Sequence, residues 1–181
     1  MITLEIPSMA ALPEYRAALL TGWSPNTTRD VSGEQLAALG ADPDAFLANL
    51  IRRDGGTIRL ADGTETPRLP GHERWIWDGA FCGRINLRFL PGTHDLPPHV
   101  SGHIGYAVVP WKRRRHYATE ALRLILPLAR QEGLEWVEIT CDVDNEPSRR
   151  VIVANGGVLQ GTRLEGADRQ PKLVFRVGTG C

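Results

Sequence analysis

Four consecutive cations, Lys112–Arg115, are the residues of this sequence best suited to bind an anion. They follow an apolar run, Gly105–Val109, that stops at Pro110, and they precede a helical apolar pattern that begins near Tyr117. This order predicts a strand, a basic loop and a helix N-terminus. The first N–H groups of a helix lack helical partners and lie at the positive end of its dipole, so they attract anions. Because neighbouring guanidinium groups strengthen such a site, the segment predicts binding of a phosphate or pyrophosphate.

A second polar segment reads Cys-Asp-Val-Asp-Asn-Glu-Pro-Ser-Arg-Arg over residues 141–150. Together the two segments resemble the GNAT superfamily of acyl-CoA-dependent N-acyltransferases. The pyrophosphate loop of that family reads Arg/Gln-x-x-Gly-x-Gly/Ala, which residues 113–118 match except that His116 occupies the glycine position. Its second signature is a strand end, an Asn-x-x-Ser/Ala helix start and a glycine after the helix, matched here by Asn145, Ser148 and Gly156.

The resemblance implies that acetyl-CoA is the co-substrate and that residues 103–160 form the CoA-binding core of a single domain spanning 1–181. In the family, the strand before the basic loop splays from its neighbour and offers backbone groups to the pantetheine arm and the acyl carbonyl. The cofactor-binding residues implied in this way are Val108, Val109, Arg113, Arg114, Arg115, His116, Tyr117, Ala118, Asn145 and Ser148.

His103 is the candidate general base. Acyl transfer to an amine requires a deprotonated amine, a stabilised carbonyl oxygen and release of the thiolate. His103 precedes Val109 by six residues, where some family members carry a carboxylate, and an imidazole with a pKa of ~6.5 can accept a proton near neutrality. An ordered water or Glu138 is the alternative base. The family's leaving-group acid is often a tyrosine on the helix after Asn145, but Ile152 stands near that position, so the role is vacant, filled elsewhere or unnecessary.

Each assignment has a simpler alternative. The cationic run can be a solvated loop or a nucleic-acid contact, although the neutral net charge and the lack of interleaved exposed aromatics count against a nucleic-acid module. Asn145 is a strong helix N-cap residue, and capping is compatible with contact to the cofactor. His103 can be a hydrogen-bonded structural histidine. Trp75 and Trp77 are typical of core or sheet packing rather than of an acceptor platform.

No metal site is predicted. His94, His99 and His103 are separated by glycine and proline residues that suit a loop, and no carboxylate or cysteine is regularly spaced with them. The cysteines are three in number and widely separated, which argues against a disulfide framework or a cysteine-based metal site and fits a reducing cytoplasm.

The overall composition excludes some partners. The 21 Lys and Arg residues balance the 21 Asp and Glu residues, so no global field draws the protein to nucleic acid or membrane. The stretch Met1–Ile6 lacks a basic start followed by a long apolar core, and no apolar run approaches the ~20 residues that cross a bilayer. We therefore expect a soluble, unprocessed, cytoplasmic protein.

The helices and strands that position these residues can be predicted from the periodicity of apolar residues and from the residues that start or stop helices and turns. We expect a strand near residues 2–6, helices at about 13–20 and from 42 onward, a capping box at 32–35, a weak strand and then a loop within 57–72, a hairpin over 75–89 with a two-residue turn at 78–79, a strand at 103–109, a helix at 116–132, a strand at 134–141, a helix at 146–154, and strands at 158–161 and 172–177. This order predicts an α/β fold with a single mixed, mostly antiparallel sheet and helices on both faces, which is also the GNAT order.

The sequence therefore predicts an N-acetyltransferase that transfers the acetyl group of acetyl-CoA to a primary amine by direct attack. The main alternative is a catalytically silent acyl-CoA-binding or regulatory domain, suggested by His116 and by the missing helix tyrosine. The acceptor is left open between small-molecule amines and protein or peptide amines, and a homodimer is also left open.

Overall fold

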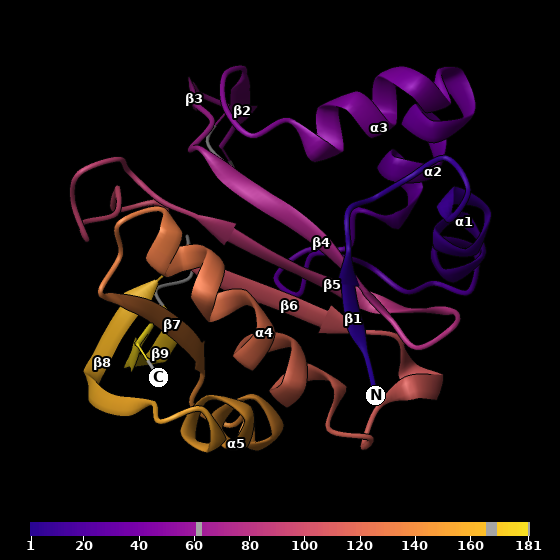
Figure 1. Ribbon diagram of the computed structural model, residues 1–181. Helices are drawn as coiled ribbons and strands as arrows, with labels where there is room; N and C mark the ends of the chain where they lie inside the picture. Colours follow the sequence, from indigo (N-terminus) through magenta and orange to yellow (C-terminus); the bar gives the residue numbers. More distant parts are fainter. Residues whose placement is uncertain (61–62, 166–169, 181) are drawn as a thin grey trace.

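The computed structural model describes residues 1–60, 63–165 and 170–180, and outside residues 57–72 its helices and strands follow the expected order (Figure 1). Along the chain these are β1 (Thr3–Glu5), α1 (Leu12–Leu20), α2 (Ser32–Ala41), α3 (Pro43–Ile51), β2 (Thr57–Arg59), β3 (Glu65–Pro67), β4 (Gly71–Trp77), β5 (Phe81–Arg88), β6 (Ile104–Val108), the 3-10 turn η1 (Pro110–Lys112), α4 (Tyr117–Gln131), β7 (Trp136–Asp142), α5 (Glu146–Ala154), β8 (Val158–Glu165) and β9 (Gln170–Gly178).

The described strands form three antiparallel sheets, with the orders β1-β4-β5-β6, β2-β3 and β7-β9-β8. The predicted fold class is confirmed, because the strands are antiparallel and helices lie on both faces of the four-stranded sheet. The predicted single sheet is wrong, since β6 and β7 belong to different sheets. The weak strand and loop expected over residues 57–72 are in fact the β2-β3 hairpin and the start of β4.

Strands β6 and β7 meet where β6 begins. The backbone N–H of His103 donates to the carbonyl of Glu138 at 2.6 Å. A side chain on Gly102, which has a φ of +76°, would place its Cβ 2.8 Å from the same carbonyl oxygen, so glycine is required for this approach. Beyond this contact the two strands are not paired, and β6 is the last strand of its sheet. One edge of β6 is therefore open as the strand runs towards the basic loop.

Helices cover both faces of the four-stranded sheet (Figure 1). On one face, Leu122 and Ile125 of α4 share a core with Ile85 of β5. On the other face, Tyr15 of α1 stacks on Trp75 of β4, with ring centroids 4.8 Å apart. Trp75 is fully buried, which confirms the packing interpretation of this tryptophan.

The first helices begin in two different ways. The predicted capping box at Ser32 is not formed, because Ser32 is already helical and Val31 at the N-cap makes no side-chain cap bond. Instead the carboxylate of Asp30 accepts a hydrogen bond from the Ser32 N–H at 2.8 Å. Helix α3 begins as predicted, with the carboxylate of Asp42 accepting from the Ala45 N–H at 2.9 Å.

The β4-β5 hairpin differs from the prediction in its turn and in its outer face. Trp77 pairs with Phe81, so the loop contains three residues and begins with Asp78. The apolar alternation of residues 81–89 places Arg84 on the outer face of the hairpin, but this face is covered by α1 and α2, and Arg84 Nε donates there to Glu73 at 2.6 Å. The Arg84 side chain is thus largely buried between the sheet and the helices, where the Glu73 carboxylate pairs with its charge.

Candidate active site

The loop between β6 and α4 has a backbone suited to an anion. Arg114 and His116 both have a φ of 60°, in the left-handed region, and His116 is the N-cap of α4 without any side-chain cap hydrogen bond. The N–H groups of residues 117–119 therefore have no helical partner and no cap. Left-handed residues within a turn direct successive N–H groups into a common concavity, which is a known anion-binding arrangement.

The left-handed φ explains why the family motif has glycine at the His116 position. Glycine adopts this conformation without a steric cost, whereas an L side chain there costs roughly 1–2 kcal/mol. Histidine is among the residues that tolerate it better than most. The departure from the motif is therefore compatible with the loop conformation, at a cost in stability.

We expect His116→Gly to raise the free energy of unfolding by up to about 1 kcal/mol, because relief of the left-handed strain exceeds the entropy that glycine gains in the unfolded chain. We also expect the His116 imidazole to donate to the CoA phosphates, so CoA binding should weaken in this variant. Denaturant unfolding and calorimetric titration with CoA measure the two effects. His116→Ala is the matched control, since it removes the imidazole but keeps the strain. Tighter CoA binding by His116→Gly than by the wild type would show that the side chain crowds the site.

The four cations of the basic run do not behave alike. Arg113, Arg114 and Arg115 are exposed, and Arg113 Nε donates to the Val108 carbonyl at 3.2 Å. The ammonium of Lys112 instead lies 2.8 and 2.9 Å from the two carboxylate oxygens of Asp78. The arginines are thus the cations available to a phosphate.

Asp78 is a residue of this site that the sequence did not reveal. Its carboxylate also accepts a hydrogen bond from the Tyr117 hydroxyl at 2.6 Å. The hydrogen bonds from Lys112 and then Tyr117 hold the pKa of Asp78 well below its usual range, so the carboxylate stays ionised. In the sequence, Asp78 reads only as a turn residue next to Gly79.

Trp111 lies beside the three arginines and is 49% exposed. It precedes the cations and is not interleaved with them, so a single exposed aromatic flanks the basic run. The neutral net charge still counts against a nucleic-acid module.

Along β6, the backbone N–H and C=O groups of successive residues point alternately to β5 and to the open edge of the strand. Val109 N–H donates to the Cys82 carbonyl at 3.0 Å, and the Val109 carbonyl accepts from Lys112 N–H at 3.0 Å. Because bonded and non-bonded residues alternate along an antiparallel strand, the N–H groups of Tyr106 and Val108 point to the open edge. Val108 and Val109 are the two valines expected to bind the cofactor through their backbone. Both backbone groups of Val109 already form hydrogen bonds within the protein, whereas the Val108 N–H points to the open edge of β6.

Residues from β6 and α5 meet next to this open edge. The hydroxyls of Tyr106 and Ser148 are 2.7 Å apart, and Asn145 caps α5 by accepting from the Ser148 N–H at 3.1 Å. The N-cap prediction for Asn145 is thus confirmed. Burial raises the pKa of Tyr106 to about 12, so its hydroxyl remains protonated at neutral pH. The sequence does not indicate this role for Tyr106, because a tyrosine in an apolar strand is usually part of the core.

The structure does not bring His103 to this part of β6. It lies five positions before Val108 in the sequence, which corresponds to roughly 16 Å along a strand. Its side chain is fully buried, its Nδ1 accepts from the Glu138 N–H at 2.9 Å, and its Nε2 has no partner among the described residues. Burial lowers the pKa of His103 to about 4. The lone pair that a base would use is therefore already occupied, and this geometry favours the structural role.

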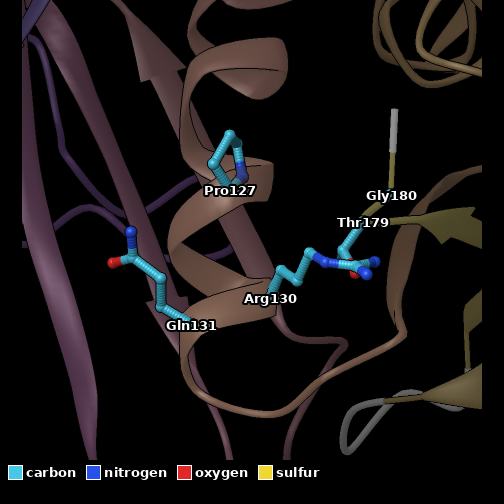
Figure 2. Close-up of a pocket in the computed structure, with 5 residues that line it drawn as sticks. All are labelled: Pro127, Arg130, Gln131, Thr179 and Gly180. Atoms are coloured by element: carbon cyan, nitrogen blue, oxygen red, sulfur yellow. The ribbon is translucent and has the colours of Figure 1, made fainter.

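One shallow hollow among the described residues lies elsewhere, at the C-terminal part of α4, and has a volume of about 540 Å³. Its lining residues, drawn in Figure 2, are Pro127, Arg130, Gln131, Thr179 and Gly180. The 15 residues of α4 span roughly 22 Å, so this hollow is well separated from the basic loop at the helix N-terminus. It is not part of the candidate active site.

Two further properties concern only the part of the chain that the structure describes. No three histidine, cysteine or acidic side chains in it are grouped closely enough to hold a metal ion. His94 accepts a hydrogen bond from the Glu135 N–H at 3.0 Å and stacks on Trp136. No helix in the described residues has the length and apolar character needed to span a membrane.

Comparison with known proteins identifies the family. The model of the acetyltransferase (GNAT) domain matches residues 34–158, more than two thirds of the chain. The chain therefore belongs to the GNAT acetyltransferase family, and it is an acyltransferase whose co-substrate is acetyl-CoA. No curated protein matches the chain in sequence.

Solved structures agree with this fold. RimJ of Mycobacterium smegmatis, solved with CoA-disulfide, has a TM-score of 0.68 and 20% identity, covering 98% of this chain and 81% of that one. The acetyltransferase of Salmonella typhimurium that modifies the N-terminal serine of ribosomal protein L7/L12 has a TM-score of 0.64 and 14% identity, covering 98% and 94%. MccE, a microcin C7 self-immunity acetyltransferase solved with acetyl-CoA and AMP, has a TM-score of 0.62 and 13% identity, covering 98% and 92%. At these identities the likeness establishes the fold alone.

Proposed function

We propose that this protein transfers the acetyl group of acetyl-CoA to a primary amine by direct attack. The observation that carries the proposal is the uncapped N-terminus of α4, preceded by three exposed arginines and placed at the end of a strand with an open edge. A pyrophosphate needs the N–H groups and the cations, and a pantetheine arm needs an unpaired strand edge.

Different groups of this site bind the pyrophosphate and the pantetheine arm of CoA. Arg113 and Arg115 contact the pyrophosphate, and the first-turn N–H groups of α4, including those of Tyr117 and Ala118, donate to it. The small side chain of Ala118 allows the close approach that the family motif requires. The pantetheine arm then lies along the open edge of β6.

The reaction needs no covalent enzyme intermediate. The amine nitrogen attacks the thioester carbonyl carbon, the C–N bond forms and the C–S bond breaks, and the amine loses a proton to water. The Val108 N–H donates to the carbonyl oxygen as its negative charge grows. The protonated hydroxyl pair of Tyr106 and Ser148 supports the leaving thiolate by hydrogen bonding, which provides an alternative to the missing helix tyrosine.

The acceptor belongs to the class of primary amines, carried by a small molecule or by a protein or peptide. One similar structure is named a ribosomal L7/L12 alpha-N-protein acetyltransferase, and another is described as modifying the N-terminal serine of the same ribosomal protein. These names support a peptide N-terminus as the first acceptor to test.

The proposal is tested by release of free CoA thiol from acetyl-CoA across a panel of amines. The panel contains peptides with different N-termini, free lysine, polyamines and aminoglycosides. We expect thiol release that depends on one class of amine and saturates with it. If the protein binds CoA but no amine accelerates thiol release above the rate without acceptor, the silent acyl-CoA-binding domain is the correct reading.

A further inference from the structure

Two shielded carboxylates hold the two ends of α4. At the N-terminal end, Asp78 contacts Lys112 at 2.8 Å and the Tyr117 hydroxyl at 2.6 Å. At the C-terminal end, Glu132 contacts Arg53 at 2.6 Å and His72 at 2.7 Å. The carboxylate side chains are similarly enclosed, with exposed fractions of 13% for Asp78 and 12% for Glu132.

The two carboxylates differ in what they hold. Glu132 links α4 to β4 and to the end of α3, away from the phosphate loop. Asp78 binds the residues on both sides of the segment 113–116, because Lys112 immediately precedes that segment and Tyr117 immediately follows it. This short segment contains both non-glycine residues of the described chain with a left-handed φ. Such residues persist only where the surrounding structure fixes them.

We propose that Asp78 is a positioning residue for CoA: it holds both ends of the segment 113–116 so that the loop keeps its anion-binding conformation before the cofactor arrives. The inference rests on the proposed function, since it concerns the same phosphate loop. Asp78 does not contact the cofactor and acts through Lys112 and Tyr117. A preformed loop binds more tightly, because binding does not have to order it.

A purely electrostatic role would have the opposite effect. Asp78 is an anion close to a site for anions, and it occupies the ammonium of Lys112. If neutralisation of Lys112 were its whole contribution, removal of the charge would free a cation and CoA would bind more tightly. The sign of the change in affinity therefore separates positioning from neutralisation.

The test is calorimetric titration of the full chain with CoA, comparing Asp78→Asn with the control Glu132→Gln. Releasing two ordered side chains should weaken CoA binding by about tenfold in Asp78→Asn. Glu132→Gln loosens the other end of α4 and should leave the dissociation constant within about twofold of the wild type.

Unchanged or tighter binding by Asp78→Asn overturns the inference, as does an equal loss in Glu132→Gln. If Asp78→Asn does not fold, Tyr117→Phe replaces it. That variant removes only the hydroxyl contact and should still weaken CoA binding, so an unchanged affinity would also overturn the inference. If the wild-type protein does not bind CoA, the proposed function fails, and this outcome is distinct from the others.

Discussion

Replacing Arg113 and Arg115 together by alanine should weaken CoA binding by about 10²–10⁴-fold. Both side chains are exposed next to the uncapped N-terminus of α4, where a pyrophosphate is expected to lie. Each charge-assisted hydrogen bond contributes about 1.5–3 kcal/mol, and each 1.4 kcal/mol corresponds to a factor of about ten in affinity. Loss of one such bond from each arginine gives the range above.

Calorimetry with CoA measures this loss, and the double variant Arg52→Ala with Arg59→Ala provides the control. These arginines are also exposed, but Arg52 follows α3 and Arg59 lies in β2. Strand β2 and the basic loop lie at opposite ends of the four-stranded sheet (Figure 1). The control changes the net charge equally and should keep nearly full affinity. Equal losses of affinity in the two variants would show that the loop arginines act only through the net charge of the protein. An unchanged affinity in the loop variant would contradict the phosphate-site assignment.

The second large effect concerns His103 and the pH dependence of stability. Burial lowers the pKa of His103 to about 4 in the folded protein, whereas an unfolded histidine titrates near ~6.5. The unfolded state therefore binds more protons between these two values, and the free energy of unfolding falls as the pH is lowered through this window. The contribution of His103 is present above about pH 6.5 and is lost towards about pH 4, with a total on the order of 3 kcal/mol.

His103→Gln should flatten this pH dependence while keeping an acceptor for the Glu138 N–H. Denaturant unfolding near pH ~4.5 and near pH ~7 measures the difference. His99→Gln changes an exposed histidine and should retain the wild-type dependence. With a verified acceptor, His103→Gln should also keep near-normal turnover. A loss of turnover by the ~10²–10⁴-fold typical of a general base, together with loss of an imidazole-like pH profile, would restore the base assignment.

Local signals in the sequence were sufficient for most elements, including the loop that joins β6 to α4. Pro43 and the preceding Asp42 define a helix start through interactions within one turn, and Asn145 caps α5 in the same way. The strand, basic loop and helix around residues 105–131 also depend on adjacent residues. These features could be predicted because the residues that form them are close in sequence.

Features that depend on pairing register or on distant contacts could not be predicted. The hydrogen bond from Val109 to Cys82 is a consequence of the β5-β6 register, and the bonds from Lys112 and Tyr117 to Asp78 cross more than thirty residues. The burial of His103 also depends on a distant contact, because the Glu138 N–H that donates to its Nδ1 lies 35 residues away in the sequence. The open edge of β6 likewise depends on which strands pair, so the sequence suggested one sheet where the chain forms separate sheets.

The central claim is that the acetyl group passes from acetyl-CoA to an amine nitrogen, and carbonyl-labelled acetyl-CoA tests it most directly. The label is followed by NMR in the presence of the amines that accelerate thiol release. The account predicts that the labelled carbonyl appears in an amide of the acceptor, in proportion to the free CoA thiol released. Label that remains in the thioester while the protein binds CoA, or that appears only as acetate, would contradict it.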